Sequence, residues 1–156
     1  MRKDEGVVVE ARVPVEAGRL LETVSRIEEA LPLCEMVGRV QRLPNGELRV
    51  VFLPRHMGLR IPHSYVFQRI SLPNGVVLEG RAFLRRLTIR VEVGDASKGS
   101  IIRVSAQCRG PELLRRIARK EVHRFLGQLL DSLFITAVGR NTGNRGSERS
   151  PSLILR

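Results

Sequence analysis

The histidines and cysteines are the residues best suited to metal or nucleophilic chemistry, and their spacing predicts no such centre. His56, His63 and His123 are scattered, without a His-x-His or His-Glu-x-x-His pattern. Cys34 and Cys108 are too few for a disulfide framework or a paired zinc motif, although a single bridge between them stays open. The Gly-x-Ser-x-Gly and phosphate-loop patterns are missing as well. We therefore expect no metal, no cofactor and no catalytic residue, and we favour a protein that is not an enzyme.

Arg85 is the polar residue with the clearest functional implication. The apolar residues at positions 87, 89 and 91 alternate with polar ones, so their side chains should share one face of a strand. The same alternation puts Phe83 and Arg85 on that face, where an arginine needs a partner or an anionic ligand. Two alternatives stay open: a bulge near Gly80 or Arg86 that shifts the phase, and a position of Arg85 in water beyond the rim.

Aromatic and aliphatic residues on predicted strands and on a predicted helix are candidates to line a cavity with Arg85. Tyr65 adds a polar hydroxyl to an aromatic row, while Phe125 and its helical neighbours are apolar. Plain core packing is the alternative interpretation of each of them. The expected ligand-binding residues are Phe52, Tyr65, Phe67, Arg85, Val104, Phe125, Leu129 and Leu133.

The charge suggests a second function class. The chain has 27 basic and 16 acidic residues, a net charge of +11, which is compatible with nucleic-acid binding. A basic cluster is expected on the exposed side of the C-terminal helix, and it contains Arg115, Arg116, Arg119, Lys120 and Arg124. A solvated helix face is the other interpretation, because few aromatic residues are left for base stacking. RNA or ribosome-surface binding is therefore our alternative hypothesis.

The bulk composition predicts one ordinary globular domain. The chain has 156 residues, of which 42% are apolar and 28% charged. No apolar run approaches the roughly 20 residues that cross a bilayer, and the first residues do not resemble a signal peptide. We expect a cytoplasmic protein without a transmembrane segment.

The elements that must position these residues follow from periodicity and turn chemistry. Alternation predicts a strand at residues 6–13, and three- to four-residue apolar spacing predicts one or two short helices at 15–30. Two Pro-Asn-Gly turns, at 44–46 and 73–75, predict two hairpins. Between Val76 and Val93 the sequence does not decide which residues face the core, because either two strands or one long bulged strand fits. A further strand at 102–108 leads into a long helix from Pro111 to Val138, which Gly139 is expected to close.

This order predicts an α+β fold in which a curved antiparallel sheet of about six or seven strands wraps around the long C-terminal helix. We expect one domain over residues 1–139, followed by a disordered basic tail over residues 140–156. No oligomeric state is predicted.

The opening VVVEARVPVEAGRLLETVSRIEEALPLCEMVGRVQRL resembles that of the START-like, polyketide cyclase-like superfamily with the helix-grip fold. In it a strand ends at a proline, a helix follows, and another proline precedes the second strand. The pattern is nearest to carbon-monoxide-dehydrogenase G-like proteins. The resemblance implies a cavity between sheet and helix for an apolar or amphipathic small molecule such as a lipid, quinone or polyketide, in a carrier, sensor or accessory protein. It also implies, as a third hypothesis, a cyclase-like or dehydratase-like enzyme, but it transfers no catalytic residue.

Overall fold

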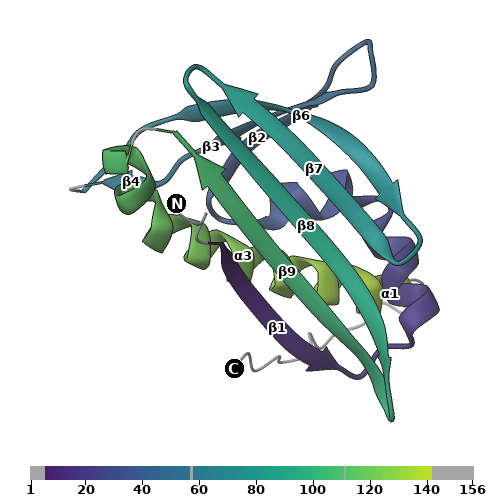
Figure 1. Ribbon diagram of the computed structural model, residues 1–156. Helices are drawn as coiled ribbons and strands as arrows, with labels where there is room; N and C mark the ends of the chain where they lie inside the picture. The colour runs from purple at the N-terminus through teal and green to yellow at the C-terminus, as the bar shows by residue number, and fades with distance from the viewer. Residues whose placement is uncertain (1–5, 57, 111, 142–156) are drawn as a thin grey trace.

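The computed structural model describes residues 6–56, 58–110 and 112–141. Its main feature is a curved antiparallel sheet with the strand order β1-β9-β8-β7-β6-β3-β2 (Figure 1). The strands are β1 (Val7–Val13), β2 (Val37–Arg42), β3 (Leu48–Phe52), β6 (His63–Leu72), β7 (Gly75–Ala82), β8 (Arg85–Ala96) and β9 (Gly99–Arg109). Two short strands, β4 (Arg55–His56) and β5 (Leu59–Arg60), form a separate small hairpin.

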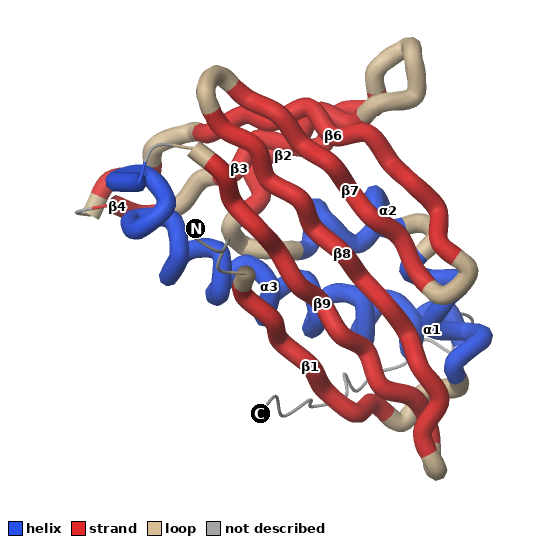
Figure 2. Tube along the Cα trace, viewed as in Figure 1, coloured by secondary structure: helices blue, strands red, loops and turns tan. Residues whose placement is uncertain are grey.

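The helices cover one face of this sheet. They are α1 (Ala17–Val24), α2 (Ile27–Ala30), the 3-10 helix η1 (Leu31–Leu33) and the long α3 (Glu112–Asn141). Figure 2 shows that they all lie on the same side of the strands. The predicted curved sheet, the short helices after the first strand and the long C-terminal helix are thus confirmed. None of the described helices is long and apolar enough to cross a membrane.

The alternating pattern of the strands produces the core. In β8 the side chains of Leu87, Ile89, Val91 and Val93 are buried, while Arg86 and Arg90, at positions of the opposite phase, are exposed. Leu126, Leu129, Leu130 and Leu133 of α3 are fully buried against the same apolar face. Because the sheet has one wet and one dry face, the helix stripe and the dry face bury each other.

The strand register decides whether residues 76–93 form two strands or one bulged strand. β7 and β8 are two strands that pair from Gly75↔Glu92 to Ala82↔Arg85, so only Phe83 and Leu84 form the turn. Leu84 has a φ of 58°, which lies in the left-handed region. Phe83 is 82% exposed, so the prediction that it lies on the inner face was wrong. The strand ends before Phe83, and alternation holds only within a strand.

The end of α3 also differs from the prediction. The helix continues past Gly139 to Asn141, and Gly139 does not have a positive φ. A glycine permits a left-handed cap but does not force one, since it also adopts helical angles. Pro111, the predicted first helical residue, and residues 142–156 of the predicted tail lie outside the described residues. The domain limits therefore stay a prediction.

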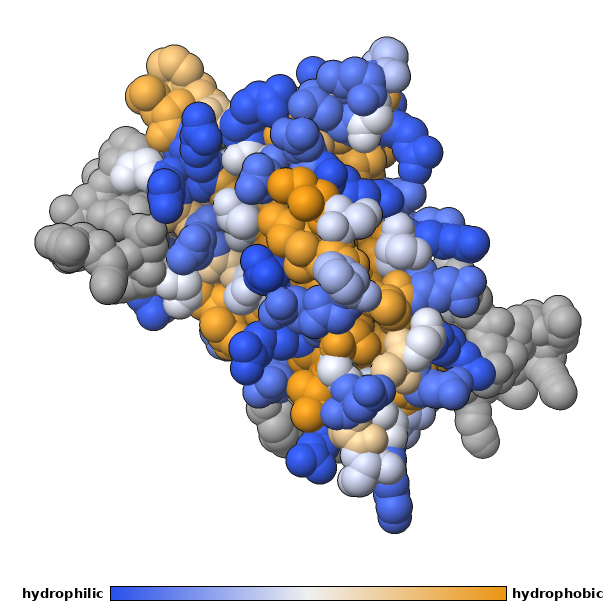
Figure 3. All heavy atoms as spheres, turned by 45° about the vertical axis from the view of Figure 1, so that its right-hand side comes forward, coloured by the Kyte–Doolittle hydropathy of each residue, from blue (hydrophilic) through white to orange (hydrophobic). Residues whose placement is uncertain are grey.

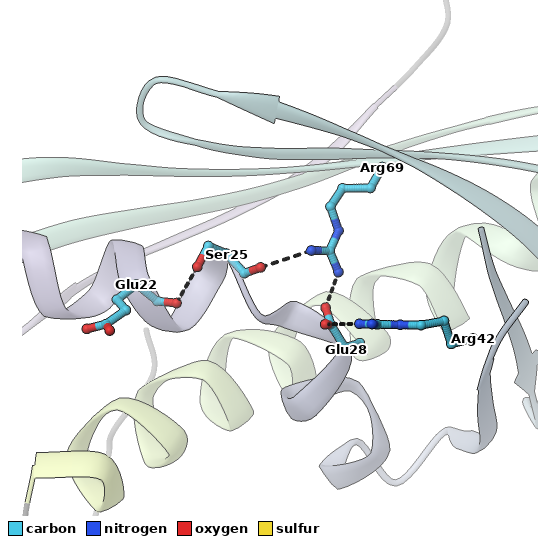
Figure 4. A network of polar contacts seen from close by, with 5 residues as sticks. All are labelled: Glu22, Ser25, Glu28, Arg42 and Arg69. Carbon is cyan, nitrogen blue, oxygen red and sulfur yellow. Dashed lines mark hydrogen bonds and ion pairs between the residues drawn. The ribbon is translucent and has the colours of Figure 1, made fainter. Parts of the chain in front are cut away.

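An ionic cluster fastens the short helices to the sheet (Figure 4). Glu28 of α2 accepts bonds from Arg42 of β2, at 2.6 Å between Nη2 and Oε2, and from Arg69 of β6. Arg69 also donates from Nη1 to the backbone carbonyl of Ser25, at 3.0 Å. The carboxylate of Glu28 thus connects two strands to α2, and Arg69 also binds the segment between α1 and α2. This holds the helical layer at a fixed position under the sheet.

Candidate ligand-binding site

Aromatic rings from the sheet and from α3 meet in one cluster in the core. Phe52 of β3 is at its centre, with its ring centroid 5.1 Å from that of Phe125, 5.9 Å from Tyr65 and 6.2 Å from Phe67. All three contacts are edge-to-face, a favourable geometry for aromatic rings. In the register, Phe52 pairs with His63, and Phe67 pairs with Leu48 and Gly80 on its two neighbouring strands. The sheet therefore brings together rings that the sequence separates.

Arg85 lies at the edge of this cluster. Its guanidinium carbon is 5.5 Å from the centroid of the Tyr65 ring, in a cation–π contact. Its Nη1 is 2.7 Å from Nδ1 of His63. Because a guanidinium can only donate, Nδ1 must accept, and the imidazole in this arrangement is neutral with its proton on Nε2. Arg85 is half-buried and in phase with Leu87, as the inward-facing hypothesis predicted.

The charge of Arg85 has no acidic partner within the described part of the chain. No described carboxylate lies within 4.0 Å of its guanidinium nitrogens. Its neighbours are instead an imidazole and a phenol. Burial raises the pKa of Tyr65, and the positive charge of Arg85 partly opposes this rise. A half-buried cation among neutral groups favours an anion at this point.

The remaining candidates of the sequence interpretation line the same core. Val104 of β9 and Leu129 and Leu133 of α3 are fully buried and belong to the same apolar core as the aromatic rings. All residues of the predicted ligand-binding set are thus on the facing surfaces of sheet and helix. Whether they contact a ligand stays a prediction.

A pocket of about 130 Å³ opens beside the aromatic cluster, between α3, the start of β2 and the end of β3. Its lining residues are Glu35, Met36, Leu53, Arg60, Glu121, Arg124 and Gln128. Gln128 accepts a bond from the backbone nitrogen of Met36, at 2.9 Å, and so joins α3 to the sheet edge. Oε1 of Glu121 is buried without a hydrogen-bond partner, with Nη1 of Arg124 3.8 Å away. The pocket is mixed in polarity and is smaller than the roughly 300 Å³ of a drug-sized site.

The sequence interpretation missed this polar side of α3. Glu121 lies four residues before Phe125, and Gln128 lies seven residues after Glu121, so the helical period places all three on one face. That spacing is the signal that could have found it. Its significance is hard to recognise in the sequence, because Glu121 also suits pairing with nearby arginines on a solvated face.

The residues of the nucleic-acid alternative are only partly described. Arg119, Lys120 and Arg124 are exposed on α3, and Arg124 pairs with Glu121 at 3.8 Å. The side chains of Arg115 and Arg116 lie outside the described part of the chain. Among the described residues, no group of three or more His, Cys, Asp or Glu side chains is arranged to hold a metal ion.

Solved structures with the same fold exist at low sequence identity. The ZhuI aromatase/cyclase from Streptomyces sp. R1128 aligns with a TM-score of 0.73 at 11% identity, over 93% of this chain and 100% of that chain. A START superfamily protein from Mycobacterium smegmatis aligns with a TM-score of 0.61 at 11% identity, over 86% of this chain and 98% of that one. The di-domain aromatase/cyclase StfQ of steffimycin biosynthesis aligns with a TM-score of 0.66 at 13% identity, over 87% of this chain but 51% of its own length.

The present chain thus spans about half of StfQ and nearly all of the other two proteins. No protein-family model matches the sequence, and no curated protein matches it significantly. At these identities the likenesses show the fold, which is the START-like helix-grip fold expected from the sequence. The more specific likeness to carbon-monoxide-dehydrogenase G-like proteins and the cytoplasmic location stay predictions. The likenesses do not support a nucleic-acid partner.

Proposed function

We propose that this protein binds an amphipathic small molecule that carries an acidic group, as a carrier, sensor or accessory protein. The apolar part of the ligand lies between the sheet and α3, and its acidic group meets Arg85. The observation that carries the proposal is the guanidinium of Arg85, which faces inward beside buried aromatic rings and has no acidic partner among the described residues. A fatty acid, an acidic quinone derivative or a polyketide has this combination of an apolar body and an anionic end.

The fold supports this proposal. Two of the similar structures are named as aromatase/cyclases, and StfQ is named as part of the steffimycin biosynthetic pathway. An enzyme of that kind is not what the present site favours, because its polar groups are one arginine, one imidazole, one phenol and the nearby thiol of Cys108, without a described carboxylate beside Arg85. Binding alone needs only the apolar surface and the cation.

The size of the pocket implies that ligand binding opens the core. A volume of about 130 Å³ next to Leu53 and Arg124 holds only part of an amphipathic ligand. Phe52 and Phe125, whose rings contact each other, are the sequence neighbours of Leu53 and Arg124 in the pocket wall, and the Phe52 ring also contacts Tyr65. We expect the ligand to move these two rings apart, so that the pocket and the Arg85 side of the cluster become one site.

Titration calorimetry with two ligands of equal chain length tests the role of Arg85. Dodecanoate and dodecanol differ in the acidic group alone. Replacing Arg85 by Met should weaken dodecanoate binding about 10- to 100-fold, as expected for a lost charge-assisted hydrogen bond, and should change dodecanol binding less than about twofold.

The matched control is Arg86→Met, one residue further on the same strand. Arg86 is exposed on the opposite face, so this variant should bind both compounds like the wild type. Equal dodecanoate binding by the wild type and Arg85→Met would disprove the role of Arg85. Failure of the wild type to bind either compound, together with native mass spectra free of any co-purifying small molecule, would disprove the proposed function as a whole.

A further inference from the structure

The turn between β7 and β8 exposes two large apolar side chains at its tip. Phe83 is 82% exposed and Leu84 is 67% exposed. In Figure 3 an apolar protrusion stands out at the upper left, at the end of the molecule where Figure 1 shows the β7–β8 turn. Side chains of this size are seldom exposed to water together at the apex of a tight turn. Their exposure therefore indicates a surface that binds a partner.

The backbone of this turn makes the choice of residues more unusual. Leu84 is the one described residue other than glycine with a positive φ, at 58°. Glycine or asparagine normally occupies such a position, because a side chain with a Cβ is strained there. The β2–β3 connection follows that rule, because its residue with a positive φ is Gly46, at 92°. Folding alone therefore does not explain an apolar pair at this tip.

The surroundings of the tip are basic. Arg81, Arg85 and Arg86 flank the two apolar residues, and residues 81–86 contain no acidic residue. Arg109, at the end of β9, pairs with Arg86 in the register and is also exposed. Arg81 forms an ion pair with Glu47, at 3.3 Å between Nη2 and Oε2. The apolar tip is thus flanked by basic residues, of which Arg86 is exposed.

A second apolar segment lies at the same end of the sheet. Leu59 of β5 is 64% exposed and Ile61 is 43% exposed. Ile61 comes two residues before His63, whose ring contacts Arg85 next to the β7–β8 turn. We call Leu59, Ile61, Phe83 and Leu84, with the exposed Arg86 beside the turn, the apolar-basic end.

We propose that the apolar-basic end docks onto the surface of a lipid bilayer that contains anionic lipids. Phe83 and Leu84 enter the boundary between head groups and acyl chains, and Arg86 contacts the lipid phosphates. The convex shape favours a bilayer over a second protein. Two side chains at a turn apex bury a few hundred Å² at most, whereas a stable protein interface needs on the order of 1,200 Å².

Vesicle co-sedimentation of the full chain tests this docking. We expect binding to vesicles of 70% phosphatidylcholine and 30% phosphatidylglycerol, and weaker binding to pure phosphatidylcholine. The double variant Phe83→Asn, Leu84→Gly should reduce binding to the anionic vesicles at least tenfold. It should fold at least as well as the wild type, because Asn-Gly suits a turn with positive φ.

Two further variants separate the apolar contribution from the charge. Arg86→Glu should weaken binding to the anionic vesicles alone. Leu33→Asn is the control, because Leu33 is 58% exposed but belongs to η1, so its binding should stay within twofold of the wild type.

Three outcomes would overturn the proposal. They are no binding of the wild type to anionic vesicles, unchanged binding of the Asn-Gly variant, and equal losses for Leu33→Asn and the Asn-Gly variant. A wild type that is dimeric by light scattering and an Asn-Gly variant that is monomeric would assign the tip to a second copy of the chain instead.

Discussion

At the scale of single residues, neighbours in the sequence have opposite roles. Arg85 faces the interior, contacting Tyr65 and His63, while Arg86 is exposed on the other face of β8. The two side chains have the same chemistry, and only the alternation of the strand separates them. At position 85 the charge is half-buried, so it can attract an anionic ligand. At position 86 the charge is exposed, and water solvates it.

Cys34 shows how burial sets the chemistry of a thiol. Its side chain is 2% exposed, and its Sγ lies 3.6 Å from Oγ of Ser132. Burial raises the pKa of Cys34 from 9.0 to about 11, while the Ser132 contact acts in the opposite direction. The native state therefore holds the thiol proton more tightly than the unfolded state does.

We predict that Cys34 makes the stability of the protein depend on alkaline pH. A thiol with a raised pKa stabilises the fold fully below pH 9.0, and this contribution is lost as the pH rises toward 11. The loss should be roughly 2–3 kcal/mol in the free energy of unfolding. Urea unfolding measured at several pH values for the wild type and Cys34→Ala checks this. A pH dependence that is the same in both proteins would contradict it.

Gly80 is required by the packing of Phe67. A Cβ at position 80 would lie 2.4 Å from the Phe67 ring, which is 1% exposed and contacts Phe52 and Tyr65. We predict that Gly80→Ala lowers the free energy of unfolding by about 1–3 kcal/mol through overpacking. Urea unfolding measures the change. Gly18→Ala is the comparison, since nothing lies within 4 Å of a Cβ there, and an equal loss in both variants would refute the packing explanation.

At the scale of elements, α3 combines two kinds of surface. One stripe of leucines is fully buried under the sheet, and beside it Glu121, Gln128 and Ser132 face the segment from η1 to β2. The polar stripe places the helix against backbone and side-chain groups at the sheet edge.

Gly127 of α3 gives an element-scale prediction. Nothing lies within 4 Å of a Cβ built at this glycine, so neither packing nor close approach requires it. Gly127→Ala should raise the free energy of unfolding by about 1 kcal/mol, because alanine is the better helix former. Thermal and urea unfolding measure the gain. A loss of stability, or a loss of dodecanoate binding without loss of stability, would show that α3 needs a flexible point here to admit a ligand.

At the scale of the whole molecule, one core holds all layers together. The buried apolar residues extend from Val13 in β1 to Ala137 in α3 and include every long strand of the sheet. Glu28 adds an ionic connection between the helical layer and two strands (Figure 4). The apolar-basic end and Arg85 lie at the same end of this body, which places the proposed membrane contact beside the proposed ligand site.

This core leads to a prediction about the domain limits. A chain that ends at Asn141 should unfold at the same urea concentration as the full chain, because residues up to Ala137 already complete the core. Unfolding followed by circular dichroism checks this. A lower midpoint for the shortened chain would show that residues 142–156 belong to the folded domain.

The sequence by itself determined the class of fold. Two Pro-Asn-Gly turns, strict alternation in β8 and β9 and the leucine spacing of α3 specify a sheet with one dry face and a helix to cover it, because side-chain direction follows local geometry. The same local rule put Arg85 on the inner face.

The tertiary structure alone decided what local rules cannot reach. Phe83 and Leu84 carry no turn signal, so only the pairing of β7 with β8 showed that the chain reverses there and exposes them. The neutral His63 beside Arg85 and the burial of Oε1 of Glu121 without a hydrogen bond depend on contacts between residues far apart in the chain. Those contacts are set by strand register and by the position of α3 under the sheet, which no short stretch of sequence encodes.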